Sequence, residues 1–170
     1  MVLGMSLAGF TLLHVAISLV GIVTGFVAVY GMHSSKRMPG WTAIFLATTI
    51  LTDVTGYFFP FEKVLPSHIV GAISLAILAV SLVALYGKRL AGPWRAIYAG
   101  TAVAALYLNA FVLVVQAFLK VAFLHDIAPT QQDPGFIIAQ GVLFVAFIGI
   151  GWLVVKSFHP AAEGRAAAAG

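Results

Sequence analysis

The chain has 170 residues, of which 62% are hydrophobic and 8% are charged, and its mean hydropathy is +1.07. A soluble domain of this length cannot bury so much apolar surface, so the composition excludes a soluble enzyme, a nucleic-acid-binding module and a disordered linker. The formal net charge of +4 is interpreted as an asymmetry between loops. Because the chain has no cysteine, any bound metal or cofactor would need His, carboxylate, amide or Met ligands.

Five apolar stretches are long enough to cross a hydrocarbon layer about 30 Å thick. They cover residues 7–32, 41–59, 65–86, 95–123 and 136–158, and Pro- and Gly-rich turns separate them. The second stretch is the shortest, so a four-span alternative with that segment re-entrant stays open. The first stretch has no basic segment before it and no small-residue cleavage site, so we expect it to remain as a helix.

Residues 16–31 and 72–87 align without a gap, and half of the aligned positions are identical. Each segment is followed by a Lys-Arg pair, a turn and a tryptophan, Trp41 or Trp94, that opens the next span. The pattern predicts an all-α membrane protein with a duplicated helical hairpin, which forms a four-helix bundle with one added helix. The repeats are 10–60 and 66–123, the added helix is 136–158, and one transmembrane domain covers 1–158. Residues 159–170 are predicted to be a flexible cytoplasmic tail.

The basic residues predict the orientation in the membrane through the positive-inside rule. Two lysines, Lys63 and Lys120, fall on one side of the predicted membrane. The others fall on the opposite side: Lys36, Arg37, Lys88, Arg89, Arg95, Lys156 and Arg165. We therefore expect the N-terminus to lie outside and the C-terminus to lie in the cytoplasm.

A few polar side chains lie within the predicted spans, where an ionisable group costs about 2.5 to 3.5 kcal/mol and usually faces the interior. Counting from the ends of the spans places several of them at a similar depth, nearer the outer surface. We expect them to form one outward-facing pocket: His14, Asp53, His68, Asn109, Gln116 and Gln140. Asp53 could instead be a structural carboxyl that pairs with His14 or Lys120, a proton relay, or a group exposed to an outer aqueous cavity.

His14 and His68 come from different predicted hairpins and lie on the same side of the membrane. This arrangement would allow two imidazoles to hold one haem iron or to share a copper or zinc ion, so both are candidate cofactor and metal ligands. The gap-free alignment places His14 opposite Val70, so the pair is not strictly symmetric, and interhelical hydrogen bonding is the alternative. No catalytic motif is present, and the catalytic residues are unknown.

Small residues repeat at helical spacing in the first and third spans. Gly21 and Gly25 share a face with Ser18, and Ser74 and Ser81 repeat at seven residues. In lipid such faces allow helices to approach closely, so we interpret both as packing seams.

Three segments carry a resemblance to known proteins: LPSHIVGAISL (65–75), LYLNAFVLVVQAFLKV (106–121) and IAPTQQDPGF (127–136). They resemble a group of small proteobacterial inner-membrane proteins to which no activity is assigned. The resemblance implies the bacterial cytoplasmic membrane, where the orientation predicted from the basic residues places the N-terminus in the periplasm. It assigns no role to any residue.

The leading functional hypothesis is a redox or electron-transfer component, in which His14 and His68 hold haem b or copper. Asp53 and the amides would then manage protons or orient a quinone-like ligand. One alternative is a non-catalytic accessory subunit or assembly factor of a larger membrane complex, with other membrane-protein subunits as partners besides the lipid bilayer. Another alternative is a small carrier. The inner halves of the first and third spans argue against it, because they contain few polar groups beyond Thr24 and Ser81.

Overall fold

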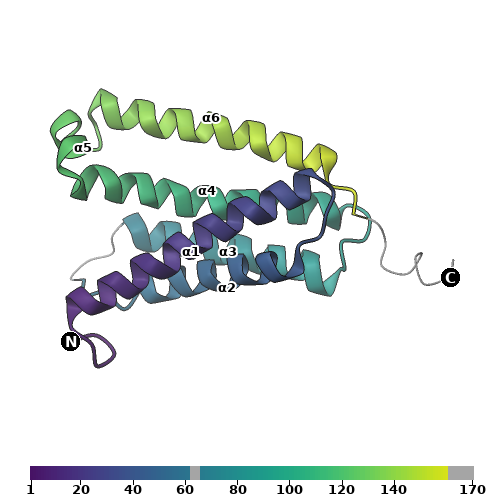
Figure 1. The fold of residues 1–170 in the computed structure, drawn as a ribbon, viewed down its shortest axis with the longest axis horizontal. Coiled ribbons are helices and arrows are strands. Elements are labelled where there is room, and N and C mark those ends of the chain that lie inside the picture. The colour runs from purple at the N-terminus through teal and green to yellow at the C-terminus, as the bar shows by residue number, and fades with distance from the viewer. Residues whose placement is uncertain (62–65, 161–170) are drawn as a thin grey trace, which may run out of the picture.

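The structure is a computed structural model that describes residues 1–61 and 66–160. This part of the chain is helical, as the sequence predicts, and the long helices run side by side along the longest axis of the molecule (Figure 1). The predicted tail beyond Pro160 lies outside the described residues. The elements are α1 (Leu7–His33), α2 (Pro39–Gly56), α3 (Pro66–Leu82), η1 (Val83–Gly87), α4 (Trp94–Lys120), α5 (Ala122–Ile127) and α6 (Pro134–Ser157).

Four helices are long and apolar enough to cross a membrane. They are α1, α3 together with its π-helical continuation η1, α4 and α6. This confirms the prediction of a multi-pass membrane protein and hence of contact with lipid. The helix α2 has 18 residues and carries Asp53 near its end, and it is not one of the four. A fifth span therefore stays a prediction.

Local sequence signals explain where the helices begin. The hydroxyl of Ser6 caps α1 by accepting a hydrogen bond of 3.1 Å from the Gly9 amide. Pro39 and Pro134 stand in the first turns of α2 and α6, where a missing amide proton costs nothing. The predicted fourth span continues to residue 123, but the helix α4 ends at Lys120 because Val121 is extended, and α5 follows as a separate short helix.

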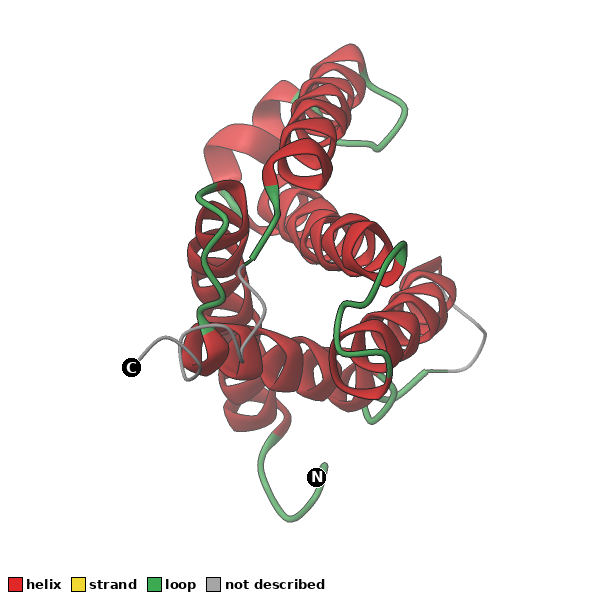
Figure 2. Ribbon diagram, turned by 90° about the vertical axis from the view of Figure 1, so that its right-hand side faces the viewer, coloured by secondary structure: helices red, strands yellow, loops and turns green. Residues whose placement is uncertain are grey.

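The helices α1 to α4 contact one another in cyclic order: α1 packs on α2 and α4, and α3 packs on α2 and α4. The fully buried side chains among them include Phe45, Leu78 and Leu106. The remaining long helix, α6, packs mainly on α4. Figure 2 views these helices nearly along their axes. We refer to α1 to α4 as the four-helix group.

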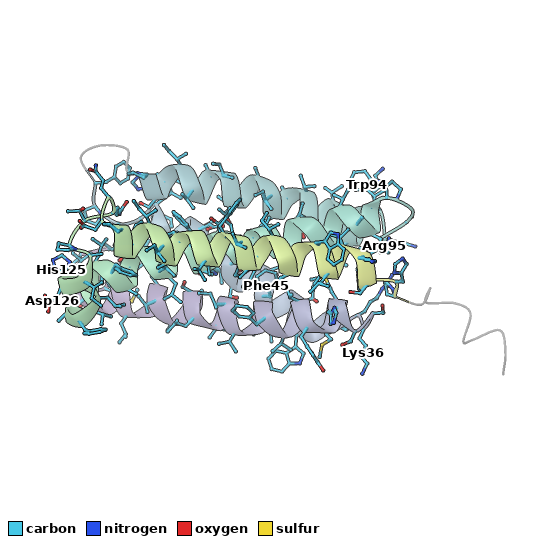
Figure 3. The ribbon with its side chains drawn as sticks, turned by 90° about the horizontal axis from the view of Figure 1, so that it is seen from above. Lys36, Phe45, Trp94, Arg95, His125 and Asp126 are labelled. Atoms are coloured by element: carbon cyan, nitrogen blue, oxygen red, sulfur yellow. The ribbon has the colours of Figure 1, made fainter. Side chains whose placement is uncertain are left out.

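The two ends of the molecule differ in charge. Lys36, Trp94 and Arg95 lie at one end, and His125 and Asp126 lie at the other (Figure 3). We name these the basic end and the His125 end. At the basic end the Arg95 guanidinium donates hydrogen bonds to the backbone carbonyls of Val155 and Phe158, which fastens the end of α6 to the start of α4.

Candidate functional site

Asn109, in the middle of α4, is a buried amide in contact with α1. The Ser18 hydroxyl donates a hydrogen bond of 3.0 Å to its side-chain oxygen Oδ1. Its amide nitrogen Nδ2 is buried and has no hydrogen-bond partner among the described residues. A buried donor without a partner is costly, so this nitrogen needs an explanation.

Asp53 occupies a comparable position on α2. The nearly inaccessible hydroxyl of Ser74, on α3, lies within hydrogen-bonding reach of its carboxyl group. The carboxyl oxygen Oδ2 is buried and, within the described part of the chain, accepts no hydrogen bond. The carboxyl is thus only partly satisfied in an interior where charge is expensive.

Each of these two pairs joins one of the helices α1 and α2 to one of the helices α3 and α4. Ser18 on α1 reaches Asn109 on α4, and Ser74 on α3 reaches Asp53 on α2. Ser74 stands as far beyond Ser18 in the sequence as Asn109 stands beyond Asp53. Each helix of the four-helix group therefore contributes one polar side chain, and the acid of one pair corresponds to the amide of the other.

Gly21 makes room for further oxygen atoms beside the Ser18–Asn109 pair, and Asp53 follows Thr49 by one turn on α2. A Cβ atom added at Gly21 would lie 3.1 Å from Thr48 Oγ1, 3.2 Å from Asn109 Nδ2 and 3.3 Å from Thr49 Oγ1. Both threonine hydroxyls donate to backbone carbonyls of their own helix, so their lone pairs remain available as acceptors. We name the whole set the polar layer: Ser18, Thr48, Thr49, Asp53, Ser74 and Asn109.

Tight apolar packing closes the polar layer toward the basic end. Phe45 precedes Thr49 by one turn on α2 and lies near the middle of the molecule (Figure 3). A Cβ atom added at Gly25 would come within 2.6 Å of Leu106 Cδ1 and 2.9 Å of the Phe45 ring. Phe45 and Leu106 are each 0% exposed. No polar path therefore continues through this point of contact.

His14 lies one turn before Ser18 on α1 and is half-buried. Its Nδ1 lies 2.8 Å from Thr55 Oγ1, and its ring packs edge-on against Phe59 with 5.2 Å between centroids. Because the Thr55 hydroxyl donates to the Leu51 carbonyl at 2.6 Å, its oxygen accepts from His14, which assigns the proton to Nδ1 and leaves Nε2 as an acceptor.

His68 contacts different residues of the segment that follows α2. The Tyr57 hydroxyl donates a hydrogen bond of 2.6 Å to the His68 carbonyl, and the two rings stack with centroids 5.4 Å apart. Phe61 lies against the same imidazole at 4.4 Å. The described contacts therefore do not bring His14 and His68 onto one ion or one haem. No group of three or more His, Asp or Glu residues within 1–61 and 66–160 is placed to hold a metal.

No described contact joins the two predicted glutamines to the polar layer. Gln140 on α6 donates a hydrogen bond of 3.2 Å to the Phe111 carbonyl, so it connects α6 to α4. Its oxygen Oε1 is buried without a partner among the described residues. Gln116 is half-buried. Of the six residues predicted to share one pocket, Asp53 and Asn109 belong to the polar layer, and the contacts do not join the other four to it.

Two cavities are present elsewhere. An apolar one of about 350 Å³ lies between α4 and α6 and is lined by residues that include Tyr107, Phe144 and Trp152. The other, of about 380 Å³, lies at the basic end. None of the six predicted pocket residues lines either cavity. The sequence reasoning missed both, although the Lys36-Arg37 and Lys88-Arg89 pairs were a signal for the second.

No family model matches the chain, and neither the curated proteins nor the solved structures contain a match to it. The resemblance to small proteobacterial membrane proteins therefore stays a prediction.

Proposed function

We propose that this protein is a multi-pass protein of a bacterial cytoplasmic membrane whose polar layer binds a proton or a small monovalent cation. The observation that carries the proposal is the pair of buried, unpartnered atoms in that layer, Asp53 Oδ2 and Asn109 Nδ2. An ionisable residue inside a membrane bundle is expensive to keep, about 2.5 to 3.5 kcal/mol on insertion scales, and usually serves function. A bound proton or cation would satisfy the acid, and a water molecule held with it would accept from the amide.

The chemistry of the polar layer favours a small cation over other ligands. Its atoms are one carboxyl group, four hydroxyl groups and one amide, so oxygen donors dominate and only one group can carry a negative charge. Oxygen ligands suit hard cations, whereas transition metals prefer imidazole or thiolate. One negative charge among neutral oxygens matches a single positive charge.

The Phe45–Leu106 contact on Gly25 supports a one-sided binding site and not a continuous channel. Polar side chains flank the layer on the side away from this contact, where His14 and Thr55 are hydrogen-bonded. The ligand would therefore arrive from the His125 end. The protein would respond to its ligand by a shift between helices, because the polar layer joins all four members of the four-helix group.

The topology belongs to the same proposal. We infer that α2 is the fifth span, that the two hairpins are a duplication, and that the basic end faces the cytoplasm. The crossed pairs Ser18–Asn109 and Ser74–Asp53 support the duplication, because corresponding serines of the two hairpins reach the second helix of the opposite hairpin. The basic residues of the described loops, which gather at one end, support the orientation.

The redox hypothesis stays a weaker proposal. It needs His14 and His68 on one haem or copper ion, and their different contacts with Thr55 and Tyr57 give it no support. The accessory-subunit alternative is favoured by one observation on α6. Gly141 and Gly149 on that helix have nothing within 4 Å of an added Cβ, which leaves room for a second helix.

A hydrophobic carbodiimide tests the cation site directly. This reagent adds a protonated carboxyl group across its C=N bond, and peptide mass spectrometry locates the adduct. We expect dicyclohexylcarbodiimide to label Asp53 in the folded protein, and Asp53→Asn to abolish that label. Asp126→Asn, a change in the short helix α5, is the matched control and should leave the label on Asp53 unchanged.

Cation competition then identifies the ligand. Protection by lithium, sodium or potassium, but not by choline at equal ionic strength, would identify a cation site. Labelling that falls only as the pH is raised would identify a proton site. The proposal is overturned if Asp53 is labelled after unfolding in detergent but not in the folded protein, with no alkali cation raising the unfolding temperature.

A further inference from the structure

The cavity at the basic end lies between the end of α1, the start of α2, η1 and the start of α4. Its volume of about 380 Å³ falls in the range of small-ligand sites. Its polar lining consists of three cationic side chains, two tyrosines and one threonine: Lys36, Arg37, Arg89, Tyr86, Tyr98 and Thr42. The remainder of its wall is apolar and includes Met32, Leu85 and Phe158.

The described part of the chain brings no carboxylate to this cavity. Asp126 lies at the opposite end of the molecule (Figure 3), Asp133 lies just before α6, and Asp53 belongs to the polar layer. Lys36 and Arg89 are both exposed and both line the cavity. The positive charges of Lys36 and Arg89 therefore face an opening from which an anion outside the described chain can approach.

The other basic residues of this end contact other groups. Lys88 lies over the Trp94 ring at 5.5 Å, and Lys156 lies over the Trp152 ring at 4.9 Å. The Arg95 guanidinium donates to two backbone carbonyls at the end of α6. Lys88, Lys156 and Arg95 are therefore basic residues of the same end that lie outside the cavity lining.

The backbone around the cavity has an unusual and specific conformation. Arg89 and Leu90 both line it and have positive φ angles of 49° and 61°, which non-glycine residues seldom adopt. Before them, the π-helical turn η1 brings Leu85 and Tyr86 into the wall, and the Lys88 amide closes that turn by bonding to the Val83 carbonyl at 2.8 Å. Such π-helical turns occur frequently at functional sites.

Exposed aromatic side chains mark the membrane depth of the cavity. Tyr30 is 69% exposed and Tyr86 is 60% exposed, close to the ends of α1 and η1. Trp41, at the start of α2, and Trp152, near the end of α6, are also exposed. Tyrosine and tryptophan collect at the level of lipid headgroups, so a lipid phosphate would lie at the same depth as the cavity.

We propose that Lys36, Arg37 and Arg89, together with Tyr86 and Tyr98, bind the phosphate group of an anionic membrane lipid in this cavity. The ammonium and guanidinium groups donate to the phosphate oxygens, and a guanidinium does so through two parallel hydrogen bonds. The apolar wall receives the first carbons of the lipid. Basic pockets between membrane helices on the cytoplasmic side suit such headgroups. The inference rests on the proposed orientation of the basic end and is independent of the polar layer.

The test titrates the purified full-length chain, in a neutral detergent, with short-chain phosphatidylglycerol and follows the unfolding temperature. Phosphatidylcholine with the same acyl chains is the neutral comparison, and glycerol 3-phosphate represents a soluble phosphate. We expect phosphatidylglycerol to stabilise the wild type and the other two to have little effect. Lys36→Gln with Arg89→Gln should weaken binding about 30-fold, since each cation near the surface contributes about fivefold.

The matched control is Lys88→Gln with Lys156→Gln, which removes the same charge from the same end but outside the cavity. It should bind phosphatidylglycerol as the wild type does, and so should Asp53→Asn, which lies outside the cavity. Circular dichroism without lipid verifies that each variant is folded. Equal losses in both double variants would mean long-range attraction only and would overturn the proposal. Equal stabilisation by glycerol 3-phosphate would overturn the lipid as the ligand.

Discussion

The Ser18 hydroxyl on α1 and the Asn109 side-chain oxygen on α4 are joined by a hydrogen bond of 3.0 Å. Interhelical hydrogen bonds in membranes contribute about 0.6 kcal/mol on average and at most about 1.7 kcal/mol. We expect Ser18→Ala to lower the free energy of unfolding by an amount in this range, measured by circular dichroism in mixed micelles. A double-mutant cycle with Asn109→Ala should return a coupling of the same size.

Ser67→Ala is the matched control for that measurement, because Ser67 is exposed near the start of α3. It should change the unfolding free energy by less than about 0.5 kcal/mol. A coupling of zero between Ser18 and Asn109 would contradict the bond as a contributor to stability.

The contact of Gly25 with Phe45 and Leu106 gives a second prediction. Gly25→Ala places a methyl group 2.6 Å from Leu106 Cδ1 and 2.9 Å from the Phe45 ring, so at least one of these two fully buried side chains has to shift. Overpacking of this kind costs about 1 to 3 kcal/mol, so the variant should unfold at lower denaturant concentration. Gly141→Ala is the control, since nothing lies within 4 Å of its added Cβ. It should be neutral or slightly stabilising.

His14 and His68 give a third prediction, which separates independent contacts from a shared ligand. His14 bonds to Thr55, and His68 stacks on Tyr57. We expect the effects of His14→Ala and His68→Ala on thermal unfolding to add within about 0.5 kcal/mol, because these contacts involve different residues. Strong non-additivity, accompanied by a Soret band or stoichiometric copper in the wild type, would favour the redox hypothesis instead.

The number of spans is testable because the chain has no cysteine, so single introduced cysteines report without background. If the chain has five spans with the N-terminus outside, the cysteines of Phe61→Cys and Gln131→Cys should react with a membrane-impermeant maleimide in intact cells. The cysteine of Ser34→Cys should react only after lysis. All three positions are exposed or lie beside exposed residues in loops. Reaction of the residue 61 cysteine only after lysis, together with residue 34, would mean that α2 does not cross.

Much of the fold follows from local chemistry. Prolines at 39, 66 and 134 begin helices, as the spacing of turns predicts, and long apolar stretches become the four membrane-compatible helices. The end of the predicted fourth span was wrong because no glycine or proline marks the break at Val121. The π-helical turn in η1 was not predicted either, since its residues fit an α-helical pattern equally well.

The candidate site was predictable only in part. Asp53 and Asn109 stand out as polar groups in apolar stretches, and their interior position is what the cost of exposing them to lipid requires. The sequence reasoning treated Ser18 and Ser74 as packing residues. Their partners depend on which faces of four helices meet, and a period of 3.6 residues along one helix does not specify that.

Hydrogen bonds hold α6 against α4 at two separate places. Gln140 donates to the Phe111 carbonyl at one of them, and Arg95 donates to the Val155 and Phe158 carbonyls at the other. Between them lies the apolar cavity beside Tyr107 and Phe144. Because its lining is apolar and it lies between two helices that are compatible with a membrane, we expect this cavity to receive an acyl chain. Lipid beside this flank should therefore exchange with the bulk bilayer more slowly than lipid elsewhere around the protein, and would copurify with it through detergent washing.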